Sequence, residues 1–383
     1  MKKKRFFYQI TTVSITSIFF SFVSPIYAAM AAEEISEELT YDHTMELSYA
    51  QQFSVDYYEG DYALITIGGE EQFFVVPEGK EAPQDLKEDI VILQQPIENI
   101  YLVATSAMDL FRAIDGIDSI RLSGTDEDGW YIEEAKEALA QGDIVYAGKY
   151  STPDYERILA EGCQLAVEST MIYHTPEVKE KLEDFGIPVL VEKSSYEPHP
   201  LARMEWMKLY AVLLGKEEKA EQIFLEQQKM VEEVLSEENT GKTVAFFYIS
   251  SVGYVNVRKP NDYIAKMIEL AGGKYIFEDL EGSENALSTM NMQMEEFYAK
   301  AKNADYIIYN STIDGELHTL EELFSKSGLL KDFKAVKEGN VWCTEKNLFQ
   351  ETTGLGQMIV DIHRMLTNED TSLTELTYMH KLQ

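Results

Sequence analysis

The sequence predicts an α/β protein of two lobes that a single long α-helix connects. Short apolar runs of strand length alternate with amphipathic helical segments, and glycines stand at many of the breaks between them. This alternation is typical of parallel sheets covered by helices. It occurs twice, before residue 200 and after residue 239, and the stretch between has helical periodicity without strands. The repetition and the helical spacer together indicate the fold class.

Length and composition agree with two folded domains and exclude several functions. The chain has 383 residues, enough for two domains of ordinary size. Its 45% of hydrophobic residues supplies real cores and excludes global disorder. The net charge of −34 would repel phosphate backbones and anionic lipids, so nucleic acid is not expected as a partner. The two cysteines, Cys163 and Cys343, are too few for a disulfide framework and are predicted to be free thiols.

Residues 1–31 are predicted to be a secretory signal peptide. Four basic residues precede a short apolar stretch, and small residues with an Ala-x-Ala pattern end at Ala31. Its removal would leave an exported chain with a net charge of −38. Use of the same segment as an uncleaved anchor is the alternative. Residues 32–50 are acidic and poorly patterned, and we expect them to form a loose leader.

The first lobe is expected over residues 32–200. It opens with a β-hairpin at 53–76, where β-branched and aromatic runs are separated by Gly and acidic turns. Strands and helices then alternate. The strands are predicted at 99–105, 143–148, 164–169 and 187–193, and the helices at 106–114, 155–162 and 178–186.

Residues 201–238 are expected to connect the lobes, and residues 239–383 to form the second lobe. Apolar residues recur on one face over 218–237, which predicts one helix about 30 Å long. Such a rod would limit the lobes to small motions. Strands of the second lobe are predicted at 242–250, 305–311 and 340–345, and its helices at 262–273, 294–304, 329–339 and 356–366.

Motifs of catalysis and of metal binding are weak. The sequence has no Gly-x-Ser-x-Gly elbow, no His-Glu-x-x-His and no Walker loop. Its six histidines are scattered without helical or turn spacing, so a preformed Zn²⁺ or Mn²⁺ cage is not predicted. The segment 124–129 resembles a calcium loop but lacks its alternating ligands, and is interpreted as a solvated turn. Neither an enzyme nor a resident cofactor is indicated.

Polar residues cluster where the predicted parallel strands end, the edge at which open α/β sheets bind ligands. Serines and threonines there can instead serve as helix caps or turn formers. Cations at this edge of an acidic protein suggest an anionic ligand, although Arg203 could instead lock the start of the connecting helix to Glu205 or a neighbouring acid. The candidate ligand-binding residues are Ser106, Lys149, Tyr150, Ser169, Thr170, Arg203, Tyr254, Arg258, Thr312 and Gln350.

Several strings, in order and spacing, resemble the solute-binding proteins of ATP-driven (ABC) importers, in the group called cluster A or class III. They are 99–111, 129–139, 143–159, 197–216, 262–273 and 303–316. The resemblance implies two Rossmann-like lobes on a helical backbone, as in metal-receptor-type periplasmic binding proteins. It also implies an extracytoplasmic monomer that captures a metal chelate, foremost a ferric siderophore, or haem or cobalamin. The partners implied are an ABC permease and its ATPase. No lipoprotein-type Cys occurs near residue 30.

The resemblance further implies that each lobe presents an acidic residue to the permease. Glu156 matches in the first lobe, and Glu296 in the second, with Glu295 as the near alternative. The other interpretation is favourable charge at a helix N-terminus. Two functions remain as alternatives on the same scaffold, a direct Zn²⁺ or Mn²⁺ binder and a secreted enzyme.

Overall fold

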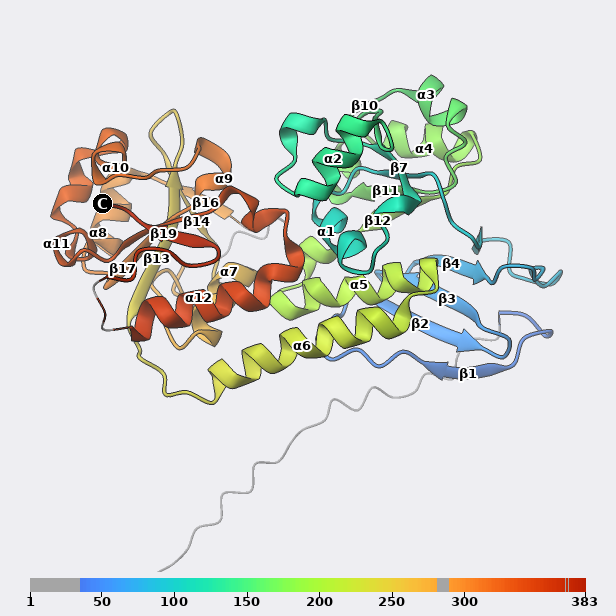
Figure 1. The fold of residues 1–383 in the computed structure, drawn as a ribbon, viewed down its shortest axis with the longest axis horizontal. Coiled ribbons are helices and arrows are strands. Elements are labelled where there is room, and N and C mark those ends of the chain that lie inside the picture. Colours follow the sequence, from blue (N-terminus) through green and yellow to red (C-terminus); the bar gives the residue numbers. More distant parts are fainter. Residues whose placement is uncertain (1–34, 281–288, 369, 371) are drawn as a thin grey trace, which may run out of the picture.

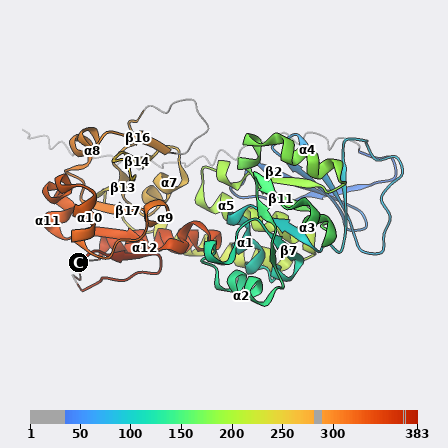
Figure 2. The same ribbon diagram turned by 90° about the horizontal axis from the view of Figure 1, so that it is seen from above.

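The computed structural model describes residues 35–280, 289–368, 370 and 372–383. Two lobes lie side by side, with long helices beneath them and a separate sheet next to the first lobe (Figures 1 and 2). The predicted signal peptide, residues 1–31, lies outside the described residues. Within the part of the chain that the structure describes, no helix has the length and apolar character needed to cross a membrane.

The amino-terminal sheet has five strands in the order β1-β2-β3-β4-β5. Its strands are β1 (Tyr41–Thr44), β2 (Phe53–Tyr58), β3 (Tyr62–Ile67), β4 (Glu71–Val76) and β5 (Val91–Gln94). The hairpin predicted at 53–76 forms its three central strands. The prediction of a loose leader was wrong for the described part of 32–50, because β1 pairs with β2 and the following backbone is held by buried carboxylates.

Two glutamates, Glu197 just before the connecting region and Glu205 within α5 (Pro200–Leu214), hold that backbone. The amides of Ser48, Tyr49 and Ala50 donate to the carboxylate of Glu205, at 2.7 to 2.8 Å. The next amides, of residues 51 and 52, donate to Glu197 at 2.9 to 3.1 Å. Both carboxylates are buried. Buried acids need such donors, so the sheet is joined to the connecting region by charge-assisted hydrogen bonds.

The sheet of the first lobe is parallel, with the order β12-β11-β6-β7-β8. Both of its faces are covered, which explains why its strands are almost wholly apolar. The strands are β6 (Ile100–Leu102), β7 (Ile120–Ser123), β8 (Val145–Tyr146), β11 (Ala166–Ser169) and β12 (Val189–Glu192), and β9 (Gly148–Lys149) pairs with β10 (Thr152–Pro153). The helices are α1 (Thr105–Ala113), α2 (Glu133–Gln141), α3 (Tyr155–Ala160) and α4 (Pro176–Asp184).

Helices α5 (Pro200–Leu214) and α6 (Glu217–Leu235) occupy the predicted connecting segment. Gly215, with a left-handed φ of 65°, ends α5 and lets the chain turn back. Helix α6 has 19 residues, so it is about 28 Å long and runs beneath both lobes (Figure 1). It packs against α12 (Leu355–Thr367), where a Cβ on Gly356 would lie 2.5 Å from Gln227 Oε1. The lobes thus rest on three packed helices.

The sheet of the second lobe is mixed. Strands β13, β15, β17 and β18 pair in parallel, whereas β14, β16 and β19 join the sheet through antiparallel pairings that the sequence pattern did not indicate. The strands are β13 (Thr243–Ile249), β14 (Val255–Arg258), β15 (Lys274–Tyr275), β16 (Thr289–Met292), β17 (Tyr306–Tyr309), β18 (Val341–Thr344) and β19 (Met379–Lys381). The helices besides α12 are α7 (Tyr263–Leu270), α8 (Met294–Ala301), α9 (Ser311–Asp314), α10 (Leu320–Lys326) and α11 (Lys334–Glu338).

Candidate ligand-binding site between the lobes

A buried carboxylate organises the strand ends of the first lobe. Glu192 ends β12, and its Oε1 accepts the amide of Ser194 at 3.0 Å. Ser106, in the first turn of α1, donates its hydroxyl to Glu192 Oε2 at 3.2 Å. Burial raises the pKa of Glu192, while the Ser194 hydrogen bonds and the charge of Arg203 oppose the rise. The predicted residue Ser106 therefore lies beside a charged group that the sequence analysis missed.

The predicted cations Arg203, at the start of the connecting helix α5, and Arg258, at the end of β14 in the second lobe, lie near the same residue. Arg203 Nη1 donates to the Ser194 carbonyl at 3.2 Å, and its guanidinium lies 4.3 Å from the ring centroid of Tyr263. Tyr263 begins α7 in the second lobe and is buried. Burial raises the pKa of Tyr263, and the charges of Arg203 and Arg258 both act in the opposite direction. Arg203 thus stacks on the buried phenol ring, and Arg258 is close enough for its charge to act on the same phenol.

Each arginine also has an acidic neighbour. Burial raises the pKa of Glu192 and the charge of Arg203 lowers it, as described above. The oxygens of Glu205, the partner considered in the sequence analysis, accept the amides of Ser48 and Tyr49. Arg258 Nη1 lies 3.7 Å from Asp262 Oδ2, and its guanidinium lies 5.1 Å from the ring centroid of Phe349. Charges, hydroxyls and aromatic rings from both lobes are therefore adjacent.

Gln350 forms a direct contact between the lobes. Its Nε2 donates to the Gly129 carbonyl at 2.8 Å, and its Oε1 accepts the amide of Tyr131 at 2.7 Å. The 124–129 turn, interpreted as solvated, is therefore partly engaged by the other lobe. In this structure Gln350 uses its side-chain amide for lobe-to-lobe bonds. One N–H of Nε2 and one lone pair of Oε1 are thereby occupied.

A second contact lies at the following residues. Thr352 Oγ1 donates to the Ser106 carbonyl at 2.8 Å. The amide and hydroxyl of Thr353 donate to Asp109 Oδ2 at 2.7 and 2.6 Å, and Arg112 binds the other oxygen of this buried aspartate. The lobes are thus joined by hydrogen bonds as well as by the helices below.

The remaining candidates lie on loops at the same strand ends. Lys149 and Thr312 are exposed, and Tyr150, Ser169 and Thr170 are half-buried. Ser169 Oγ accepts the amide of Met171 as a helix cap, which is the local role allowed for in the sequence analysis. Tyr254 is 42% exposed beside the β13–β14 turn. These side chains share an edge with the two arginines without forming one compact set with them.

Exposed apolar side chains gather on these loops. Their positions follow strands β7, β8, β11 and β12 in the first lobe and β13 and β17 in the second. Large apolar residues left open to solvent in this way mark interaction surfaces. They are Tyr131, Tyr146, Met171, Tyr173, Tyr196, Val252, Tyr254 and Ile313. Periodicity did not reveal them, because it reports which residues face a core.

A second buried acid, Glu168, lies one residue before Ser169 in β11. Neither of its carboxylate oxygens has a hydrogen-bond partner, and burial raises its pKa to about 8. An acidic residue inside an apolar strand run, as at Glu168 and Glu192, was the signal that could have identified both.

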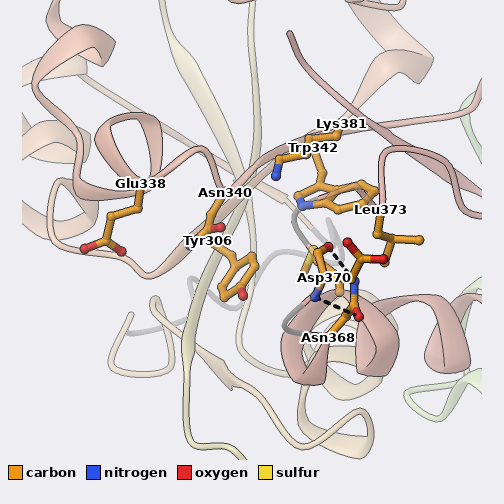
Figure 3. Close-up of a pocket in the computed structure, with 9 residues that line it drawn as sticks. Tyr306, Glu338, Asn340, Trp342, Asn368, Asp370, Leu373 and Lys381 are labelled. Atoms are coloured by element: carbon orange, nitrogen blue, oxygen red, sulfur yellow. Dashed lines mark hydrogen bonds between the residues drawn. The ribbon is translucent and has the colours of Figure 1, made fainter.

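One pocket lies at the opposite edge of the second lobe, near the start of β17 and of β18 (Figure 3). It is lined by Tyr306, Asn340, Trp342 and Lys381, among others, and Asn368 and Asp370 bond to one another beside it. Its volume of about 80 Å³ is well below the roughly 300 Å³ at which small-molecule sites begin. This pocket is not a site for a metal chelate.

The predicted docking residues are on the surface. Glu156 lies in the first turn of α3, and Glu295 and Glu296 lie in the first turn of α8. All three are exposed. Their positions are compatible with docking and equally with a favourable interaction with the helix N-terminus.

Comparison with known proteins identifies the family. Residues 104–348 match the family model described as periplasmic binding protein. The chain belongs to this family. The match begins after the amino-terminal sheet, so strands β1 to β5 lie outside the matched region. An uncharacterized lipoprotein of Methanocaldococcus jannaschii is 28% identical over 342 residues, covering 84% of this chain and 79% of that protein.

Solved structures share the fold. A periplasmic heme binding protein of Pseudomonas aeruginosa matches with a TM-score of 0.57 and 15% identity, over 75% of this chain and 98% of that one. The petrobactin-binding protein of Bacillus subtilis matches with a TM-score of 0.56 and 12% identity, over 71% and 93%. The predicted two-lobed class III architecture is confirmed.

Proposed function

We propose that this periplasmic binding protein captures a small anionic metal chelate, foremost a ferric siderophore, between its lobes and delivers it to an ABC permease and ATPase. The observation that carries the proposal is the convergence near Tyr263 of Arg203, at the start of the connecting helix α5, and Arg258, of the second lobe. Guanidinium groups bind carboxylate and other oxyanion ligands with planar, directional hydrogen bonds. A ligand placed there would contact both lobes at once.

The nature of the surrounding side chains supports a chelate in preference to a bare ion. The strand-end loops carry exposed tyrosines and aliphatic residues, which suit the organic part of a chelate. Among the described residues, the set of His and carboxylate groups close enough to hold a metal lies within the second lobe, not between the lobes. Two structural neighbours are described as a heme-binding and a petrobactin-binding protein, which supports a small-molecule ligand for this chain.

Delivery would use the exposed acids Glu156 and Glu296, with Glu295 as the alternative. The family relationship supports a permease partner. The predicted signal peptide supports export, and the lipoprotein relative agrees with a position outside the cytoplasm.

Binding is tested by titrating purified protein with a panel of ferric siderophores, haem and cobalamin while following tryptophan emission. Trp130 is the buried middle residue of the Gly129–Tyr131 segment that Gln350 holds, so ligand entry should change its fluorescence. Calorimetry supplies the affinity. Unchanged emission and an unchanged melting temperature across the whole panel would refute the proposal.

Variants locate the site. Arg203→Gln and Arg258→Gln should each weaken binding of the cognate chelate at least about tenfold, because a charge-assisted hydrogen bond contributes about 1.5–3 kcal/mol. Arg157→Gln is the matched control, since Arg157 is half-exposed on α3 and pairs with Asp154. Equal affinity in all three variants would place the ligand elsewhere.

A further inference from the structure

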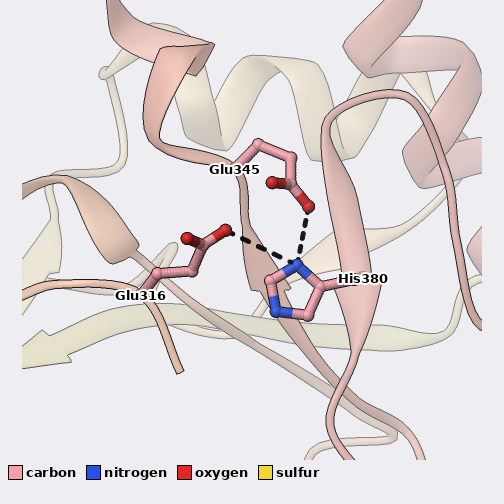
Figure 4. A group of neighbouring side chains, drawn as sticks. All are labelled: Glu316, Glu345 and His380. Carbon is pink, nitrogen blue, oxygen red and sulfur yellow. Dashed lines mark hydrogen bonds and ion pairs between the residues drawn. The ribbon is translucent and has the colours of Figure 1, made fainter. Parts of the chain in front are cut away.

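Three side chains of the second lobe converge outside the site described above. Glu316 follows α9, Glu345 follows β18, and His380 lies in β19. One ligand atom from each lies within 4.8 Å of the others, and Figure 4 shows both carboxylates directed at the imidazole. His380 is buried, and Glu316 and Glu345 are partly so. The arrangement brings together the segment that follows α9, the helix that contains Thr312, and the segment after β18, which leads to Gln350.

The orientation of the imidazole is determined by a backbone contact. Nε2 of His380 lies 2.7 Å from the Leu317 carbonyl, and since a carbonyl only accepts, Nε2 carries a proton. Nδ1 then faces the acids, 2.6 Å from Glu345 Oε1 and 3.9 Å from Glu316 Oε1. Metal-binding histidines characteristically donate their second ring N–H to a backbone carbonyl or a carboxylate. His380 already has this arrangement.

The two carboxylates of Glu316 and Glu345 favour a positive charge next to Nδ1 of His380. Two carboxylates and the imidazole Nδ1 share the space, with ligand atoms within 4.8 Å of one another. A deprotonated Nδ1 presents a lone pair, which would repel a carboxylate oxygen at 2.6 Å unless a proton or a metal ion lay between them. A fourth donor is near, because His318 stacks on His380 and its Nε2 lies 3.9 Å from Glu316 Oε2.

We propose that Glu316, Glu345 and His380 bind a divalent transition-metal ion, foremost Zn²⁺, with His318 or water as the fourth ligand. Imidazole nitrogen and carboxylate oxygen are zinc donors at roughly 2.0–2.2 Å. Tetrahedral coordination at that distance separates neighbouring donors by about 3.3 Å. The observed separations of 2.6 and 3.9 Å from Nδ1 bracket this value, so side-chain adjustment alone would complete the site.

A metal ion there would connect the loops of the second lobe that face the first. Glu345 directly precedes the short helix Lys346–Phe349, which leads to Gln350 and its contact with the other lobe. Glu316 directly follows α9 and its turn, where Thr312 lies. The ion would thus stiffen this face. Binding of the metal ion does not require the transported ligand, since all the protein donors to the ion belong to one lobe.

The experiment is a calorimetric titration of purified protein with ZnCl₂ alone. The expected result is one Zn²⁺ per chain. Glu345→Gln, Glu316→Gln and His380→Gln should each weaken it by at least about tenfold, the smaller effect seen when even an outer partner of a metal ligand is lost. The controls Glu321→Gln and His174→Gln replace exposed residues of the same types and should bind as the unmodified chain does.

Thermal unfolding with and without Zn²⁺ gives a second measurement. Zn²⁺ should raise the melting temperature of the unmodified chain and both controls, and at the same concentration should raise that of Glu345→Gln less. The isosteric glutamine variants decide the matter if His380→Gln does not fold. Absence of stoichiometric binding, or equal binding by the Glu345→Gln and Glu316→Gln variants, would overturn the proposal and assign the position between Nδ1 and Glu345 to a proton.

Discussion

Replacing Glu168 by Gln should remove a large part of the pH dependence of stability. The carboxyl is fully buried with no hydrogen-bond partner for either oxygen, and burial raises its pKa from 4.5 to about 8. The folded protein therefore keeps a proton that the unfolded chain releases. The stabilising contribution of this proton is complete below pH 4.5 and is lost as the pH rises toward 8.

The magnitude follows from linkage. Between those two values the free energy of unfolding falls by about 1.4 kcal/mol per pH unit. By pH 7 the loss due to Glu168 amounts to about 3 kcal/mol, a substantial share of the roughly 5–15 kcal/mol that stabilises a typical domain. Glutamine keeps the shape of the protonated acid and does not titrate. Its advantage over glutamate should therefore grow with pH.

Urea unfolding at pH 5, 6, 7 and 8 measures this difference. Glu168→Gln should gain about 3 kcal/mol on the unmodified chain between pH 5 and pH 7. Glu180→Gln, at an exposed position of α4, is the control and should follow the unmodified chain. Other buried acids also have raised pKa values and also lower the stability as the pH rises. Their contribution is the same in every variant, so it cancels in the difference between two variants. Parallel stability curves for Glu168→Gln and the unmodified chain would show that Glu168 is ionised in the fold and refute the reasoning.

Three further substitutions test the packing of the helices and lobes. Gly354→Ala should destabilise by about 1–3 kcal/mol, because its Cβ would lie 1.9 Å from the Tyr378 hydroxyl; an unchanged melting temperature would contradict this. Glu205→Gln should cost about 1–3 kcal/mol in urea unfolding, because the carboxylate accepts three backbone amides, whereas exposed Glu218→Gln should cost nothing measurable. Gln350→Ala should increase the radius of gyration in solution scattering by loosening the lobes, and an unaltered profile would show that the other contacts suffice.

Much of the fold was predictable because a parallel strand covered by helices on both faces is apolar along its whole length, which the sequence shows directly. Six predicted strands are buried on both faces and therefore appear in the sequence as short apolar stretches. They are β6, β11, β12, β13, β17 and β18. Strands β14 and β19 were missed, because they carry polar residues such as Asn256 and His380 and are recognised only by their antiparallel pairing with other strands. The leader was misjudged for a similar reason. Its order depends on Glu205, far along the sequence.

The site was predictable in its chemistry more than in its contacts. Arg203 and Arg258 were chosen as cations at strand ends, and the fold brings both to Tyr263. Nothing local could show that Gln350 would bind Gly129 across the lobes. The set of Glu316, Glu345 and His380 was equally hidden, because it joins segments that only the sheet of the second lobe brings together.

The close packing of α12 on α6 at Gly356 bears on how quickly a cargo is exchanged. A side chain added at Gly356 has no room against Gln227, and further hydrogen bonds join the lobes above these helices. A wide swing of one lobe would have to break both layers of contact. The time that a ligand stays bound should then be set by small motions of loops at the strand ends, such as the β13–β14 turn, where Val252 is 76% exposed. A ligand would leave past a displaced loop, without separation of the two lobes.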